Sequence, residues 1–194
     1  EGIRRFKGMP PHESASGVKK IKIDGLFSDW QDVKPEYRAK RGNTIHRNSK
    51  GRGKYVYTNT TGRNDIVSAK VARDSRNLYF YVACAESITQ PCSKSWLNLF
   101  IDIDRKRQTG WEGYDYMISG HSANGKATLL RSDNGWNWSK VADVEYRVDG
   151  NSLELVIPRK SLGLIRGNAV EFEFKWVDNM QREGDVYEFY LNGD

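Results

Sequence analysis

Apolar and polar residues alternate along most of the chain from residue 66 onward, which is the period of a β-strand with one buried face. Tight-turn sequences separate the alternating runs, and Asn124-Gly125 and Asp149-Gly150 both supply residue types that accept a positive φ. The pattern therefore predicts short strands joined by hairpin turns. The predicted strands cover residues 66–72, 78–82, 97–103, 114–119, 126–131, 144–148, 152–157, 170–177 and 186–191.

Helical signals are confined to short segments. Residues 26–33, around Trp30, predict one or two helical turns, and residues 158–163 predict one capped turn. Many short strands with hardly any helix are typical of a sandwich. The sequence thus predicts an all-β fold, a two-sheet antiparallel β-sandwich of the jelly-roll or immunoglobulin-like kind, with one or two short helical turns.

The N-terminal third is less regular. Residues 1–17 have the pattern of a helix end followed by a linker, so we expect them to finish a preceding domain, with a frayed terminus as the alternative. Residues 18–194 are expected to form one domain. Residues 19–23 alternate and predict its first strand. Residues 34–64 are polar, basic and Gly-rich, which predicts a long loop with a short strand at 55–57, of the kind that is usually functional or mobile.

Composition and charge narrow the range of partners. The 194 residues have 12% aromatic side chains and a net charge of +6, and no run approaches the ~20 apolar residues of a membrane helix. No helix-turn-helix, zinc-finger or ribonucleoprotein motif accompanies the positive charge, which favours a solvated surface over nucleic-acid binding. An acidic polysaccharide partner stays open. The basic groups are Arg4, Arg5 and Lys7; Arg38, Lys40 and Arg41; Lys50, Arg52 and Lys54; and Arg105, Lys106 and Arg107.

Cys84 and Cys92 are the only two cysteines, and a Gln-Pro turn lies between them. If they end adjacent strands, their Cα atoms come within disulfide range, and an exported protein would form the bond. We expect a Cys84–Cys92 disulfide, with two free thiols as the alternative. Without further cysteines or paired histidines, a zinc site is not expected.

Several motifs, in order along the chain, resemble family 9 carbohydrate-binding modules and their DOMON-like relatives. The motifs cover roughly residues 20–194, and the resemblance is closer to domains at the C-terminus of large secreted bacterial proteins that carry a glycoside hydrolase domain. They are Ile23-Asp24-Gly25 with Asp29-Trp30, Asp74-Ser75-Arg76-Asn77-Leu78-Tyr79, residues 99–104, Thr109-Gly110-Trp111, Gly113-Tyr114-Asp115, and residues 153–158 with Leu162-Gly163-Leu164.

This resemblance implies a β-sandwich that binds an oligosaccharide or polysaccharide, sometimes with structural calcium, outside the bacterial cell (secreted, periplasmic or on the cell surface). It also implies a catalytic domain preceding this one in the same chain. The sequence departs from the pattern at one position, because Cys92 stands where xylanase-attached members carry one of two aromatics that clamp a sugar ring.

Candidate sugar-binding residues are the tryptophans near polar or Gly-rich turns. Aromatic faces stack on sugar rings while nearby polar groups fix the hydroxyls. Trp111 is flanked by glycine, and Trp136 and Trp138 share a face if their segment is extended. One of these two could instead fill the core while the other covers it. Trp96, which begins a predicted strand, is a fourth candidate that could belong to either class.

The plausible hard-cation cluster is Asp102, Asp104 and Asp115. Asp102 and Asp104 alternate onto one strand face, and the returning chain brings Asp115 toward them. Calcium takes six to eight oxygen ligands, which loop carbonyls near residues 109–111 would complete. The alternative is that these carboxylates cap turns or pair with Arg105 and Arg107.

Catalytic signatures are weak. No carboxylate pair stands out as a glycosidase dyad, and no Gly-x-Ser-x-Gly elbow or Cys–His pair offers a nucleophile. The sequence therefore predicts a non-catalytic carbohydrate-binding accessory module of a larger polysaccharide-degrading protein. The alternative is a structural domain that packs against a neighbouring glycoside hydrolase domain and binds no ligand of its own.

Overall fold

The computed structural model describes residues 13–42, 44, 47–50, 56–164 and 169–180. Strands dominate, and two short 3-10 helices, η1 (Phe27–Trp30) and η2 (Arg159–Leu162), are the helical elements of the described residues. The all-β prediction is therefore confirmed. The strands are β1 (Tyr37–Arg38), β2 (Arg47–Lys50), β3 (Val56–Asn59), β4 (Ile66–Arg73), β5 (Asn77–Cys84), β6 (Asn98–Asp102), β7 (Tyr116–Ser122), β8 (Lys126–Asn134), β9 (Asn137–Asp149), β10 (Ser152–Pro158) and β11 (Glu173–Val177).

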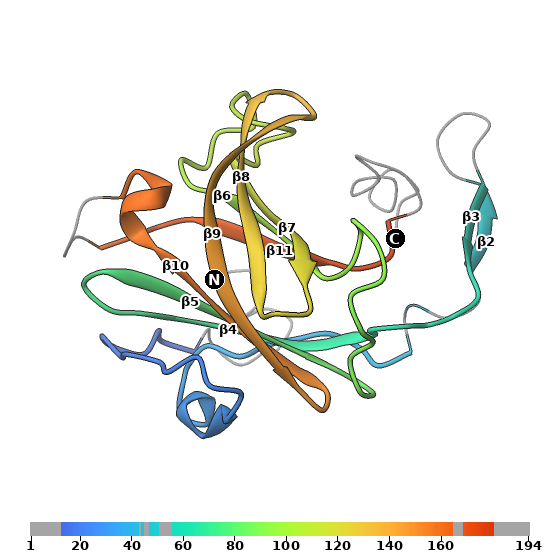
Figure 1. Ribbon diagram of the computed structural model, residues 1–194, viewed down its shortest axis with the longest axis horizontal. Helices are drawn as coiled ribbons and strands as arrows, with labels where there is room; N and C mark the ends of the chain where they lie inside the picture. Colours follow the sequence, from blue (N-terminus) through green and yellow to red (C-terminus); the bar gives the residue numbers. More distant parts are fainter. Residues whose placement is uncertain (1–12, 43, 45–46, 51–55, 165–168, 181–194) are drawn as a thin grey trace, which may run out of the picture.

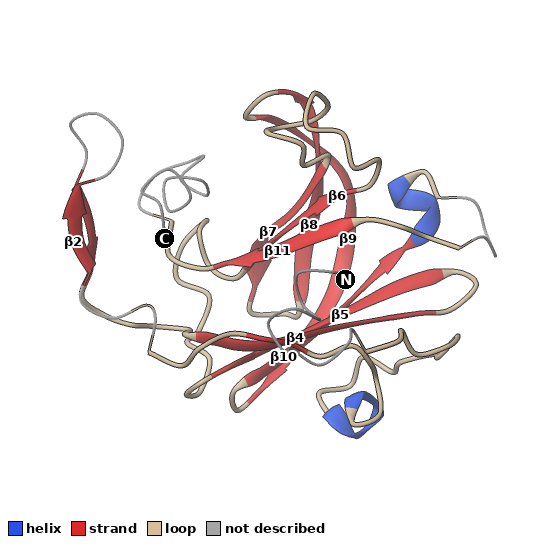
Figure 2. Ribbon diagram, turned by 180° about the vertical axis from the view of Figure 1, so that it is seen from behind, coloured by secondary structure: helices blue, strands red, loops and turns tan. Residues whose placement is uncertain are grey.

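Nine of these strands form one antiparallel sheet in the order β1-β4-β5-β10-β9-β8-β7-β6-β11. The sheet is strongly curled, so that the half containing β4, β5 and β10 faces the half containing β6, β7, β8 and β11 (Figures 1 and 2). The architecture differs from two separate sheets because the ladder continues through the β9–β10 hairpin at Asp149-Gly150. At the seam between the sheet edges, Tyr37 of β1 contacts Phe174 of β11 with ring centroids 5.4 Å apart.

The main core lies between the two halves. Period-two alternation explains it: in β6, Leu99 and Ile101 point inward, whereas Phe100 points to the outer face. Strand β9 contributes to both halves, and register shifts in its ladder with β8, such as the one between Leu129 and Leu130, allow local bending. Fully buried members of this core include Leu78, Phe80, Val82, Ile118, Leu153 and Leu155.

The segment before β1 covers the outer face of the β4–β5–β10 half. Glu154 of β10 is 0% exposed, and its carboxylate accepts hydrogen bonds from the backbone N–H groups of Asp24 and Gly25 and from Trp30 Nε1. The predicted strand at residues 19–23 is wrong. Residues 19–23 are not part of a strand ladder. The N–H of Lys19 donates to the carbonyl oxygen of Arg73 in β4, and buried side chains such as Ile21 hold the segment against the sheet.

Most other element predictions are confirmed, including both helical turns; Gly163 ends η2 at a φ of 69°. Strands β8 and β9 extend further toward each other than the alternation indicated. The predicted strand at 186–191 and the predicted helix end at residues 3–7 lie outside the described residues.

The predicted long loop at 34–64 contains three short strands. Strand β1 joins the main sheet, whereas β2 and β3 pair only with each other as a two-stranded hairpin. Figure 1 shows this hairpin at one side of the molecule, away from the curled sheet. No helix in the described part of the chain has the length and apolar character needed to cross a membrane.

Candidate functional site

An aromatic cluster lies on the outer face of the β6–β7–β8–β9 half of the sheet. Its buried members are Phe100 of β6, Met117 of β7 and Trp111 of the loop between these two strands. Partly buried residues packed against them are Tyr114, Leu130, Trp136, Trp138, Val177 and Met180. The structure therefore brings together three of the four predicted sugar-binding tryptophans.

The rings of this cluster pack mainly at steep angles. Trp136 meets Trp111 at a centroid distance of 4.7 Å and an interplanar angle of 79°, and it meets Trp138 at 5.6 Å and 86°. Phe100 lies beneath the group, 5.7 Å from Trp111 and 5.4 Å from Tyr114. Edge-to-face packing of this kind is favourable for aromatic rings. The contacts on both sides fix the orientation of Trp136.

The sequence explains how these rings meet. Trp136 and Trp138 flank Asn137 at the start of β9, after a turn in which Gly135 has a φ of 55°. Trp111 belongs to the loop between β6 and β7, where it forms an isolated bridge with Tyr114. Gly110 is required there, because a Cβ at that position would lie 2.1 Å from the carbonyl oxygen of Tyr114.

Exposure differs among the tryptophans. Trp136 and Trp138 are half-buried, and Trp111 is only 9% exposed. Trp138 Nε1 is buried and has no hydrogen-bond partner among the described residues. The two alternatives for Trp136 and Trp138 are thus resolved toward a shared, partly covered surface cluster and not toward the main core.

Trp96 lies apart from the other three. It is 1% exposed within the main core, and its Nε1 donates to the carbonyl and hydroxyl oxygens of Thr89. His121 and Tyr146 contact its ring. This burial leaves almost no face on which a sugar ring could stack.

Sequence reasoning missed two features of the cluster. Phe100 was recognisable, because its neighbours Leu99 and Ile101 point to the core and alternation puts Phe100 on the opposite face. Lys175 could not be recognised from the sequence, because it lies opposite Phe100 only through the pairing of β11 with β6. Burial lowers the pKa of Lys175 to about 8.

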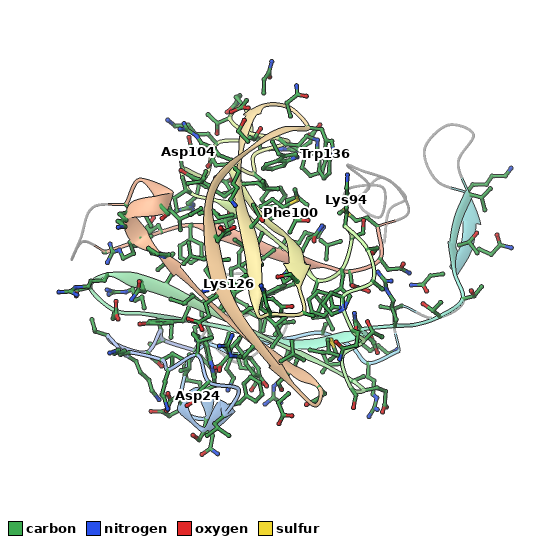
Figure 3. All side chains as sticks on the ribbon, viewed as in Figure 1. Asp24, Lys94, Phe100, Asp104, Lys126 and Trp136 are labelled. Atoms are coloured by element: carbon green, nitrogen blue, oxygen red, sulfur yellow. The ribbon has the colours of Figure 1, made fainter. Side chains whose placement is uncertain are left out.

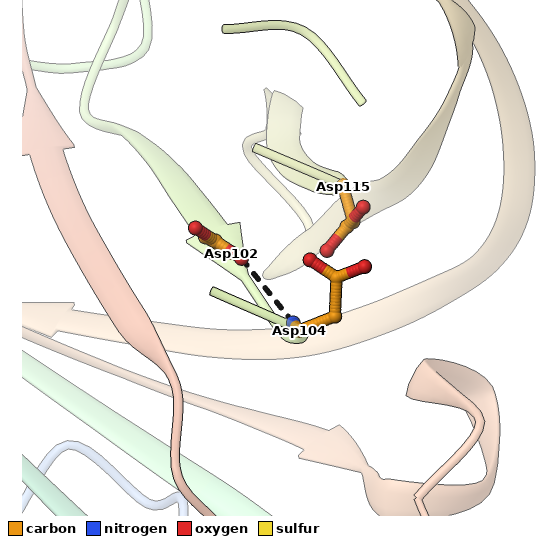
Figure 4. Close-up of side chains that lie close together, drawn as sticks. All are labelled: Asp102, Asp104 and Asp115. Carbon is orange, nitrogen blue, oxygen red and sulfur yellow. Dashed lines mark hydrogen bonds between the residues drawn. The ribbon is translucent and has the colours of Figure 1, made fainter. Parts of the chain in front are cut away.

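The predicted acidic cluster is also assembled. One oxygen of each of Asp102, Asp104 and Asp115 lies within 4.8 Å of the others (Figure 4). Asp102 at the end of β6 is buried, Asp115 is half-buried and Asp104 is exposed. Figure 3 shows Asp104 in the same upper part of the molecule as Phe100 and Trp136.

Each carboxylate also organises the loop that follows β6. Asp102 accepts from the backbone N–H of Arg105 at 2.6 Å, Asp115 from that of Ile103 at 2.9 Å, and Asp104 from that of Lys106 at 2.9 Å. The loop-capping alternative therefore holds for one oxygen of each residue. The second oxygen of each carboxylate has no hydrogen bond to the described part of the chain.

The electrostatics of the cluster fit a divalent cation. Burial, followed by the neighbouring carboxylates, raises the pKa values of Asp102 and Asp115, because desolvation and like charge both disfavour the ionised form. A hard cation would reverse this effect, and carboxylate oxygens are its preferred ligands. Among the described ion pairs, none joins these carboxylates to Arg105 or Arg107, and Arg105 pairs with Glu171 instead.

A polar surface pocket of about 450 Å³ adjoins the acidic cluster. Asp104 and Asp115 line it, together with Ser132, Asp133 and Asn134 at the end of β8. The chain continues from this end of β8 through the turn that contains Trp136 and into β9, which carries Trp138. Hydrogen-bonding groups and aromatic rings are therefore neighbours at one end of the sheet.

The predicted disulfide is absent from the structure, in which both cysteines are free. Cys84 ends β5 with its side chain in the main core, where burial raises its pKa to about 12. Cys92 is exposed in the following loop, where Arg63 Nη1 donates to its Sγ at 2.8 Å. The expectation failed because the chain after β5 forms a loop and not an adjacent strand.

Three kinds of comparison bear on the identity of the chain. Protein-family models, characterised proteins and solved structures were each compared with it, and none of them matches.

Proposed function

We propose that this chain is a non-catalytic carbohydrate-binding accessory module, which acts outside the bacterial cell beside a catalytic domain of the same protein. The observation that carries the proposal is the gathering of Trp111, Trp136 and Trp138 next to a polar pocket. Sugar sites combine aromatic faces with a few polar groups that fix the hydroxyls. The four sequence motifs that resemble family 9 modules in residues 99–115 and 153–158 support the same class.

Trp136 is the central stacking residue of the proposed site. Trp111 and Trp138 each meet it nearly edge-on, so its ring is held in one orientation before a ligand arrives. A preorganised ring loses little conformational entropy on binding. The side chains of Ser132, Asp133 and Asn134 at the adjoining end of β8 would bind sugar hydroxyls.

Calcium at Asp102, Asp104 and Asp115 is the second part of the proposal. The ion would offset the repulsion among three close carboxylates and tie the loop after β6 to the start of β7. It would act by fixing Trp111 through that loop and not by contacting a sugar. One oxygen of each carboxylate lies within 4.8 Å of the others, which is close enough for a single calcium ion, with ligand distances of about 2.3–2.6 Å, to contact all three.

Affinity gels and glycan arrays test the proposal. Trp136→Ala is expected to weaken binding to a neutral plant polysaccharide about tenfold or more, because it removes the stacking face. Leu26→Ala is the control: Leu26 is an exposed apolar side chain (67%) just before η1, in the segment that covers the other half of the sheet, and its loss is expected to leave binding unchanged.

Two results would refute the proposal. Failure of the intact chain to bind any glycan would favour a structural domain that packs on a neighbouring hydrolase through the aromatic cluster. Equal binding by Trp136→Ala and Leu26→Ala would place the sugar elsewhere on the surface.

A further inference from the structure

A partly apolar pocket of about 430 Å³, which we call the seam pocket, lies where β11 and the residues before it meet β1 and β4 (Figure 2). Its apolar wall is made by Tyr37, Val71, Leu78, Phe172 and Phe174. The described lining residues include no member of the aromatic cluster. The volume falls within the range of about 300–1,000 Å³ that is usual for sites of small organic ligands.

The seam pocket leads toward the main core. Leu78 is a fully buried member of that core, and Phe172 and Phe174 pack against it from the pocket side. In the described sheet, β1 and β11 are the two end strands and share no ladder, so side chains close the seam. A small apolar molecule would therefore gain buried contacts there without breaking backbone hydrogen bonds between strands.

The aromatic rings around the pocket pack edge to face. Tyr37 meets Phe174 at a centroid distance of 5.4 Å and an interplanar angle of 82°. Behind them, Phe80 meets Phe172 at 5.8 Å and 64° and Phe174 at 5.7 Å and 70°. Such contacts stabilise aromatic pairs beyond the burial of their area. An aromatic ligand would extend this arrangement, whereas a saturated molecule of the same size would gain burial alone.

The charged side chains at the pocket nearly balance one another. Three cations and two carboxylates line it: Lys34, Arg73, Arg105, Glu171 and Glu173. Lys34 pairs with Glu13, and Arg105 pairs with Glu171. The two other groups, Arg73 and Glu173, have opposite charges. Since an ionised ligand would lose hydration in an apolar pocket without meeting a net opposite charge, the lining favours an uncharged ligand.

We propose that the seam pocket binds a small uncharged aromatic molecule, with its ring against Tyr37 and Phe174 and any hydroxyl group at the charged mouth. The apolar wall supplies the burial, the edge-to-face rings supply the preference for an aromatic ligand, and the balanced charges supply the preference for a neutral one. The inference does not depend on the proposed glycan site, which lies on the outer face of the other half of the sheet.

Isothermal titration calorimetry at neutral pH with three related ligands tests the chemical class. The ligands are 2-naphthol, its saturated analogue decahydro-2-naphthol, and the anion 2-naphthoate. We expect 2-naphthol to bind, and each of the other two to bind about fivefold more weakly or less, because one lacks the aromatic ring and the other carries a charge. Equal affinities for 2-naphthol and decahydro-2-naphthol, or tighter binding of 2-naphthoate, would overturn the proposal.

Tyr37→Leu tests the position, because it removes a ring and keeps an apolar wall. We expect it to weaken 2-naphthol binding about fivefold and to leave decahydro-2-naphthol binding nearly unchanged. Phe174→Leu is a second variant with the same expected result. Phe27→Leu is the matched control: it makes the same kind of change in η1, where Phe27 contacts Tyr81 in a different cluster, and it should leave both affinities unchanged.

The remaining outcomes separate this pocket from the proposed glycan site. Trp136→Ala is expected to retain 2-naphthol binding while it loses binding to a neutral polysaccharide. Binding of 2-naphthol by a chain that binds no glycan would refute the proposed function and support this inference. Loss of 2-naphthol binding in Trp136→Ala would place the ligand in the aromatic cluster and overturn the inference, as would equal losses in Tyr37→Leu and Phe27→Leu or no saturable binding of 2-naphthol.

Discussion

His121 makes the stability of this fold depend on pH in a direction that the structure fixes. Its ring lies between Trp96 and Tyr146, with centroid distances of 4.8 and 4.9 Å. Both ring nitrogens are buried without a hydrogen-bond partner among the described residues. Burial therefore lowers the pKa of His121 from its usual 6.5 to about 4.

The sign follows from which state takes up the proton. Below pH 6.5 the unfolded chain protonates this histidine, while the folded protein keeps it neutral until the pH approaches 4. The free energy of unfolding is thus unaffected above that window and falls as the pH drops through it. The full pKa difference corresponds to a loss of about 3 kcal/mol.

Urea unfolding followed by tryptophan fluorescence, at pH values from about 7 down to about 4, measures this loss. In His121→Phe the ring is kept and the titration is removed, so the stability of wild type relative to this variant is expected to fall by about 3 kcal/mol across the window. Titration of Asp102 and Asp115 is common to both proteins and cancels in the difference.

Tyr146→Phe is the matched control, because it removes the hydroxyl that donates to the Ser122 carbonyl at 2.8 Å without changing any group that titrates near pH 5. It is expected to lower stability by a constant amount of about 1 kcal/mol at every pH. If wild type and His121→Phe show parallel pH dependence, the ring of His121 is hydrated and the reasoning fails.

Three further predictions concern the other supports of the fold and site. Glu154→Ala is expected to cost about 3 kcal/mol or more in urea unfolding, because three N–H donors lose their acceptor; Glu154→Gln, which keeps an oxygen, should cost less. Gly110→Ala is expected to lower the thermal midpoint and weaken neutral-glycan binding, since the methyl group meets the Tyr114 carbonyl; Gly163→Ala, with open space around it, should affect only stability. Asp115→Asn is expected to raise the melting temperature in EDTA by relieving carboxylate repulsion, and to abolish the stabilisation that millimolar calcium gives the wild type. Equal calcium shifts in wild type and Asp115→Asn would rule out the metal site.

Local signals predicted the elements of this fold better than their assembly. Alternation and turns such as Asp149-Gly150 identified the strands, since each depends on neighbours in sequence. Residues 19–23 alternate equally well yet form no strand ladder. The printed backbone hydrogen bond between this segment and the main sheet runs from the N–H of Lys19 to the carbonyl oxygen of Arg73. Whether strands make one sheet or two depends on long-range pairing, which alternation does not encode.

The candidate site shows the same division. Asp102 and Asp104 could be grouped from their spacing, and the chain reversal brought Asp115 to them. The Cys84–Cys92 pairing failed because spacing alone does not reveal that one side chain enters the core. Trp96 resembled the other tryptophans in sequence, and only the three-dimensional packing separates it from them.

The seam between β1 and β11 has a consequence for how the molecule opens. Side chains such as Tyr37 and Phe174 close it, whereas backbone hydrogen bonds join all the strands that are neighbours in the order of the curled sheet. Local opening of the fold should therefore begin at this seam. The two halves of the sheet would then separate by bending at the β9–β10 hairpin, which stays paired. In native-state hydrogen exchange, amides of β9 and β10 are expected to exchange last and those flanking the seam first.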